Sequence, residues 1–87
     1  MLQRLIRKED GSVVVYGLCC RHLWMGTGLD YYTVFRPGEE QADYFCEYCF
    51  NRLSIYETIA MERCCPCCVS WMLASHRLID EIEMELP

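Results

Sequence analysis

The spacing of eight cysteines in a chain of 87 residues constrains the fold more than any other feature. Two residues separate the members of three pairs of metal-ligand type, which are Cys19 and His22, Cys46 and Cys49, and Cys65 and Cys68. This gap lets both side chains of one tight turn reach the same ion. Zinc takes four thiolate or imidazole ligands in a tetrahedral arrangement, so any two pairs complete a structural site. We expect one zinc ion, and a second ion stays an open alternative.

The state of the thiols depends on the compartment. Eight cysteines form four disulfides in a secreted protein, but they stay reduced and bind metal inside the cell. The first ten residues, MLQRLIRKED, contain no apolar core and no small-residue cleavage site, so they do not predict a secretory signal. We therefore expect a cytoplasmic, reducing location and free thiols.

Length and charge narrow the class of protein. The chain has the size of one domain, residues 1–87, and so short a chain often adds a metal to its small apolar core. Apolar residues make up 53% of it, which excludes a disordered tail, and the sequence has no apolar run long enough to span a membrane. Its net charge of −5 disfavours a nucleic-acid-binding surface, which needs clustered basic residues.

The N-terminal half predicts strands. Val13–Tyr16 and Tyr31–Phe35 are rich in β-branched and aromatic residues, and glycine or proline follows each of them. They flank a loop that contains Gly26 and Gly28. This arrangement predicts an antiparallel ribbon.

The C-terminal half predicts helices. Residues 39–65 contain neither glycine nor proline, and their apolar positions recur every three or four residues. They predict one long helix, or two short ones if Ser54–Glu57 is a capping box. Pro66 should end this pattern and begin a new helix over residues 69–86. The predicted fold class is α+β: an N-terminal β-hairpin with a zinc knuckle, followed by two or three helices and stapled by zinc.

Two combinations of the pairs can form the first site. Cys19, His22, Cys46 and Cys49 resemble the ligands of treble-clef zinc fingers, in which a knuckle turn, a β-hairpin and a helix start follow one another. This resemblance covers about residues 13–53. Alternatively, Cys46, Cys49, Cys65 and Cys68 have a spacing typical of zinc sites, and the sequence at residues 65–68 resembles the knuckle of zinc ribbons and rubredoxins. Both combinations use Cys46 and Cys49.

The remaining candidates have a simpler interpretation. Cys20, Cys64 and Cys67 are expected in the core, because a free cysteine behaves as a small hydrophobic residue. His76 lies on an apolar stripe and is expected to be a hydrogen-bonded core histidine. Its alternative role is that of a ligand for a second ion, together with residues 64–68.

The motifs favour binding over catalysis. The chain has no His-Glu-x-x-His, no His-x-Glu and no glycine-rich phosphate loop, so we do not expect an enzyme. We expect a structural zinc module that binds a protein partner as an adaptor, accessory subunit or inhibitor. The acidic end of the last predicted helix, with Glu81 and Glu85, should belong to the docking surface. Two alternatives stay open: a nucleic-acid-binding zinc finger that uses Arg4, Arg7 and Lys8, and a thiol redox protein that uses residues 64–68.

Overall fold

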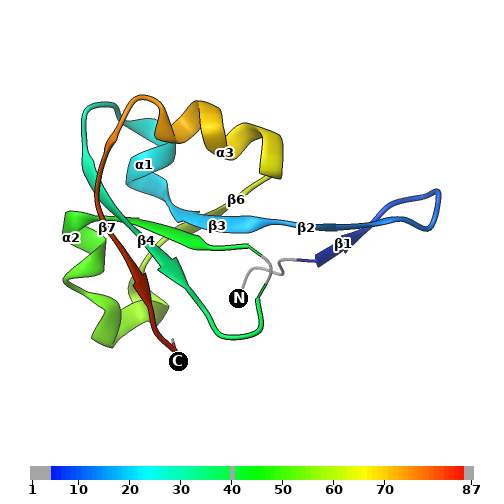
Figure 1. Cartoon of the computed structure of the whole chain (residues 1–87), viewed down its shortest axis with the longest axis horizontal. Helices are drawn as coiled ribbons and strands as arrows, with labels where there is room; N and C mark the ends of the chain where they lie inside the picture. The colour runs from blue at the N-terminus through cyan, green and yellow to red at the C-terminus, as the bar shows by residue number, and fades with distance from the viewer. Residues whose placement is uncertain (1–4, 40, 86–87) are drawn as a thin grey trace.

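The computed structural model describes residues 5–39 and 41–85, which form an α+β fold (Figure 1). A five-stranded sheet has the strand order β6-β3-β5-β4-β7, and a two-stranded hairpin of β1 and β2 extends beyond it. In chain order the elements are β1 (Leu5–Arg7), β2 (Val13–Val15), β3 (Gly17–Cys20), α1 (Arg21–Met25), β4 (Asp30–Phe35), β5 (Asp43–Cys46), α2 (Glu47–Phe50), the 3-10 helix η1 (Leu53–Thr58), β6 (Met61–Cys64), α3 (Pro66–Leu73) and β7 (Arg77–Glu83). None of the described helices is long and apolar enough to cross a membrane.

The direction of the strands decides which ends of them meet. β3 is parallel to β5, with Cys19 opposite Tyr44, and antiparallel to β6, with Cys20 opposite Met61. The C-terminal ends of β3 and β5 therefore lie side by side, whereas β6 runs the other way and ends next to the start of β3. Gly17 allows a close approach at the start of β3, because a Cβ atom there would lie 3.0 Å from the carbonyl oxygen of Ala42.

The core lies around the central strands. Phe45 of β5 and Val34 of β4 are fully buried, and the ring of Phe45 meets that of Tyr56 edge-on at 6.1 Å between centroids. Cysteines contribute an unusual share of this core, since Cys19, Cys20 and Cys64 are also completely buried. Thiols thus take part both in packing and in any metal chemistry near the sheet.

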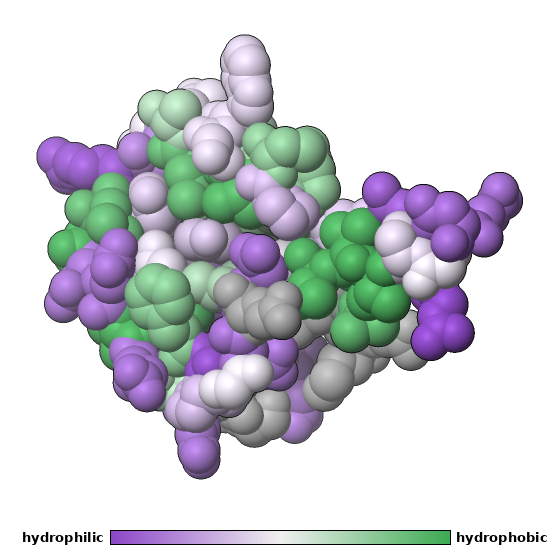
Figure 2. All heavy atoms as spheres, turned by 45° about the vertical axis from the view of Figure 1, so that its right-hand side comes forward, coloured by the Kyte–Doolittle hydropathy of each residue, from purple (hydrophilic) through white to green (hydrophobic). Residues whose placement is uncertain are grey.

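The hairpin of β1 and β2 differs in polarity between its tip and its base. Its turn is closed by Asp10, whose carboxylate accepts hydrogen bonds from the backbone and the hydroxyl of Ser12, and these bonds lower the pKa of Asp10. Figure 2 shows hydrophilic side chains at the tip of the hairpin and hydrophobic ones at its base. Val13, which pairs with Arg7 next to the turn, is exposed.

The predicted strands exist, but their pairing differs from the prediction. Residues 13–15 form β2 and residues 30–35 form β4, in agreement with the sequence pattern. The two do not form a ribbon, because β2 pairs with β1 while β4 pairs with β5 and β7. The N-terminal hairpin is therefore built from residues 5–15 alone. The predicted knuckle at residues 19–22 is instead the end of β3 and the start of α1.

The helix or pair of short helices predicted over residues 39–65 is only partly correct, because α2 and the 3-10 helix η1 are the helical segments there. These residues form β5, α2, η1 and β6 in succession. Strand pairing outweighs the helical spacing of the apolar residues, because β5 is hydrogen-bonded to β3 on one side and β4 on the other. The aromatic residues Tyr44 and Phe45 also favour a strand at this position.

The predicted helix over residues 69–86 is only partly correct. As expected, a helix begins at Pro66, but α3 ends at Leu73 and residues 77–83 form β7, which pairs in parallel with β4. Glu81 therefore lies in an edge strand and does not oppose a helix dipole. Exposed acidic residues on an edge strand discourage pairing with other chains, which gives them a structural role within this fold.

Candidate metal centre

Four potential metal ligands meet where β3 and β5 end. The sulfur atoms of Cys20, Cys46 and Cys49 and a ring nitrogen of His22 all lie within 4.8 Å of one another, and we call these residues the closed group. Nδ1 of His22 is 3.2 Å from Sγ of Cys49 and 3.5 Å from Sγ of Cys46. Three sulfurs and one imidazole nitrogen make a donor set that suits a tetrahedral metal ion.

Two similar strand-to-helix turns build the closed group. Cys20 is the last residue of β3 and the N-cap of α1, and Cys46 is the last residue of β5 and the N-cap of α2. Both caps have extended backbone angles, with φ and ψ of −67° and 149° at Cys20 and −65° and 163° at Cys46. Each turn adds a second ligand from the helix that follows, His22 or Cys49. Because β3 and β5 are parallel neighbours, the two turns lie side by side.

The sulfur atoms of the closed group are buried and the histidine is exposed. The side chains of Cys20, Cys46 and Cys49 are at most 4% exposed. Burial raises the pKa of the Cys20 thiol, and burial together with the neighbouring thiols raises that of Cys49. A bound cation would reverse this preference, because metal ions stabilise the thiolate.

Neighbouring groups already support the ligands. The backbone N–H of Cys46 donates a hydrogen bond of 3.2 Å to Sγ of Cys20. The ring of Tyr48 meets the imidazole of His22 edge-on, at 5.7 Å between centroids. Such contacts orient metal ligands and tune their affinity.

A second cluster of thiols lies at the start of α3. The sulfur atoms of Cys65, Cys67 and Cys68 lie within 4.8 Å of one another, and we call these residues the open group. Cys65 is the N-cap of α3, and its sulfur accepts a hydrogen bond of 3.2 Å from the backbone N–H of Cys68. Hydrogen bonds from Cys68 and Cys67 lower the pKa of Cys65, while the bond to Cys65 raises the pKa of Cys68 to about 11. Cys67, which was expected in the core, is exposed, so this group is accessible from solvent.

Cys19 and Cys64 form a third, fully buried contact. Their sulfur atoms are 2.7 Å apart between the neighbouring strands β3 and β6, and Cys64 also contacts the sulfur of Met72 at 3.9 Å. The hydrogen bond between the two thiols raises the pKa of Cys19 and lowers that of Cys64. Cys19 therefore belongs to the packing between β3, β6 and α3.

The structure brings together only part of the predicted site. His22, Cys46 and Cys49 meet as expected, but the fourth member is Cys20, which the sequence placed in the core, and Cys19 lies against Cys64. Cys65 and Cys68 lie in the open group with Cys67 and not with Cys46 and Cys49. The good helix formers in the segment Arg21–Met25 are the sequence feature that could have identified Cys20, and not Cys19, as the fourth member. A helix there makes Cys20 its N-cap.

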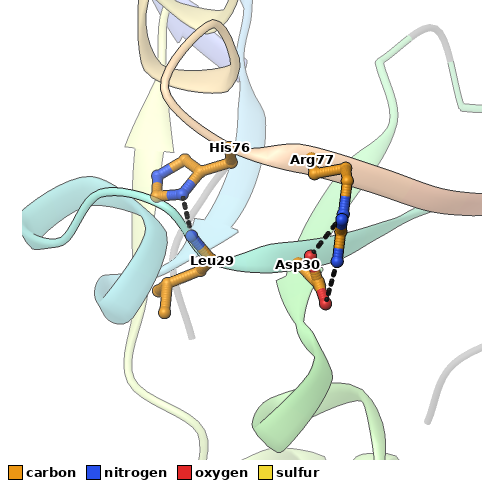
Figure 3. Close-up of polar contacts among 4 residues, drawn as sticks. All are labelled: Leu29, Asp30, His76 and Arg77. Carbon is orange, nitrogen blue, oxygen red and sulfur yellow. Dashed lines mark hydrogen bonds and ion pairs between the residues drawn. The ribbon is translucent and has the colours of Figure 1, made fainter.

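His76 has a structural role. Its Nδ1 accepts a hydrogen bond of 3.1 Å from the backbone N–H of Leu29, as Figure 3 shows, and its Nε2 lies 2.8 Å from the carbonyl oxygen of Leu23. The ring must therefore be neutral, with its proton on Nε2 donated to Leu23. Next to it, Arg77 forms two hydrogen bonds to Asp30, of 2.9 and 3.1 Å (Figure 3). These contacts join β7 to the start of β4, and they leave neither ring nitrogen of His76 for a metal ion.

Comparison with protein-family models, curated proteins and solved structures finds no match to this chain. The site must therefore be interpreted from its own geometry. What the geometry defines is a small α+β protein with cysteine and histidine side chains positioned to hold a metal ion.

Proposed function

We propose that the chain is a structural zinc module in which Cys20, His22, Cys46 and Cys49 bind one Zn²⁺ ion. The observation that carries this proposal is the convergence of four donor atoms, from two strand-to-helix turns, within 4.8 Å of one another. Three thiolates and one imidazole are a common ligand set of structural zinc sites. Four protein ligands complete the tetrahedral shell, so the ion holds the fold together and activates no water molecule.

The order of the elements supports the resemblance to treble-clef zinc fingers. The first two ligands are followed by the antiparallel strands β4 and β5, and α2 then begins with the last two ligands. This order agrees with that of the family over residues 13–53. The chain differs in its first ligand turn, which leads into the short helix α1 where the family has a knuckle.

The surface between α1 and α3 supports a role in binding protein. A groove with a volume of about 380 Å³ lies there, and Trp24, Met25 and Trp71 are among the residues that line it. Trp71 is 85% exposed and Met25 is 77% exposed, although both are large and apolar. Tryptophan is enriched among the residues that contribute most to the affinity of protein interfaces. We therefore infer that the module acts as an adaptor, accessory subunit or inhibitor, within a reducing cytoplasm that keeps its thiols free.

The charge distribution favours protein over nucleic acid as the partner. Arg7 and Lys8 are exposed near the tip of the hairpin, but Glu9 and Asp10 follow them directly. Arg4 lies outside the described residues. A nucleic-acid surface needs basic residues that are not offset by adjacent acidic ones, and the net charge is −5.

The zinc proposal is tested by counting ions. Native mass spectrometry of the purified chain should show one zinc ion per chain, and a strong chelator should remove it with loss of near-ultraviolet dichroism. A zinc content well below one per chain in protein purified without chelator would refute this proposal.

The partner proposal is tested with one groove variant and one control. Trp71→Ala should reduce the recovery of specific proteins from the native host, while the folding of the module stays unchanged. Ile55→Ala is the matched control, because Ile55 is also an exposed apolar residue but lies on η1, outside the lining of the groove. Equal recovery by both variants would exclude the groove. Recovery that disappears after nuclease treatment would favour the nucleic-acid alternative.

A further inference from the structure

The open group has no role in the proposed zinc site, yet it brings three thiols together at the surface. Cys65 and Cys67 have their sulfur atoms 3.2 Å apart, and both lie within 4.8 Å of the sulfur of Cys68. Among the described residues, no imidazole or carboxylate belongs to this group. Its donors are therefore three soft sulfur atoms, without a fourth ligand from the group itself.

The position of the open group separates it from the closed group. β6 is antiparallel to β3, so its last residue lies next to the start of β3 and away from the C-terminal ends of β3 and β5. The caps at Cys20 and Cys46 thus lie together, while the cap at Cys65 has no neighbouring cap among the described residues. An ion in the open group would be bound independently of the structural zinc.

We propose that Cys65, Cys67 and Cys68 form a second metal site, which binds one Cu(I) ion through three thiolates and leaves the ion accessible from solvent. Soft sulfur ligands favour soft ions such as Cu(I). Cu(I) is stable with three ligands, whereas structural Zn²⁺ takes four. The donor count therefore favours Cu(I) over a second zinc ion.

The start of α3 offsets the charge that such a site acquires. Binding Cu(I) to three thiols releases their three protons, so three negative sulfurs and one positive ion leave a net charge of −2. The positive end of the helix dipole stabilises negative charge at this position. The backbone N–H of Cys68 already donates a hydrogen bond to the sulfur of Cys65, and this bond can persist with a thiolate acceptor.

The surroundings allow an ion to enter and leave without unfolding. Cys67 is exposed and Cys65 and Cys68 are partly exposed, in contrast to the buried sulfurs of the closed group. Cys68 also lines the groove between α1 and α3, together with Trp71. This proximity makes the fluorescence of Trp71 a reporter of metal binding at the open group.

The test is a titration of the full chain, loaded with zinc, with Cu(I) in the presence of a competing chelator and without oxygen. We expect one Cu(I) ion per chain to bind while the zinc stays bound, with quenching of tryptophan fluorescence. X-ray absorption at the copper edge should show a shell of three sulfur atoms. Release of zinc as copper binds would place the copper in the closed group and overturn the proposal.

Two variants make the test specific to the open group. Cys67→Ser should weaken Cu(I) binding by on the order of 100-fold or more, because it removes a direct ligand where even indirect supports matter 10- to 100-fold. The matched control is Ser70→Ala, an exposed position on the same helix, which should bind Cu(I) as the original chain does. Zinc content and dichroism should be unchanged in both variants. Equal Cu(I) affinity in the two variants, or a second zinc ion that Cu(I) does not displace, would overturn the proposal.

Discussion

The closed and open groups start from the same local structure and differ in what surrounds it. In each of the three strand-to-helix turns, a cysteine with an extended backbone caps the helix. Cys20 and Cys46 are the last residues of their strands, and Cys65 directly follows β6. Two of these turns follow parallel neighbouring strands and meet, whereas the third follows an antiparallel strand and stands apart. The direction of a strand therefore decides whether its cap joins the closed group or lies apart from it in the open group.

The comparison also shows how burial divides the two roles. Buried thiols are costly to charge and gain most from a permanently bound ion, which supports the structural role proposed for the closed group. An exposed group at a helix start can exchange a bound ion with solvent. Two cysteines separated by two residues can thus belong to a buried group, as Cys46 and Cys49 do, or to an exposed one, as Cys65 and Cys68 do.

The largest expected effect is a difference in stability between variants of Cys49 and Cys68. Each of these residues lies three positions after its capping cysteine. Cys49→Ser should unfold the domain, because structural zinc contributes on the order of 10 kcal/mol in small peptides, comparable to the stability of a whole domain. Cys68→Ser should keep the native fold and its zinc. Near-ultraviolet dichroism and melting temperature distinguish the two. A folded Cys49→Ser variant with a native melting temperature would contradict the assignment of the closed group.

A smaller but sharper contrast comes from the adjacent residues Cys19 and Cys20, which are both completely buried. Cys20→Ser should abolish stoichiometric zinc binding, because it removes a ligand. Cys19→Ser should keep one zinc ion per chain and lose only about 1–3 kcal/mol, the usual cost of an altered buried polar contact. Native mass spectrometry and urea unfolding measure the two quantities. If Cys19→Ser loses the zinc and Cys20→Ser retains it, the ligand predicted from the spacing alone is the correct one.

The smallest expected effect is a change of sign in the dependence of stability on pH. In the metal-free chain, the folded pKa values of Cys20 and Cys49 lie above the ordinary thiol value of 9.0. The unfolded chain then ionises first, so stability is present below pH 9.0 and falls as the pH rises through the folded pKa values, by up to about 1.4 kcal/mol per pH unit for each thiol. With zinc bound the thiols are ionised, and stability falls instead as the pH decreases and protons compete with the ion.

Urea unfolding with and without chelator, at pH values above and below 9.0, measures how the stability of the metal-free and zinc-loaded forms depends on pH. If the metal-free chain does not fold, the acid side of the zinc-loaded curve still tests the prediction. The same slope in both forms would show that zinc does not bind the thiolates of the closed group.

The sequence predicted which side chains meet at the candidate site better than it predicted the path of the chain. Cys46 and Cys49 were identified from their spacing alone, because the gap between two ligands is a local property. Cys20 was not, because the choice between two adjacent cysteines depends on where β3 ends and α1 begins. The long helix was predicted from apolar spacings that also occur when short strands and short helices alternate. Only pairing with β3 and β4, which are distant in sequence, decides between these structures.

The exposure of β7 has a consequence for the order in which the fold opens. β7 is an edge strand whose side chains are all exposed except that of Ile82, which is half-buried, and it pairs with β4 across more than 40 residues of chain. Segments with few buried contacts open locally long before the whole domain unfolds. β7 and its ion pair between Arg77 and Asp30 should therefore form a separate unit of low stability. Its amide protons should exchange with solvent while those of β3 and β5, beside the closed group, remain protected.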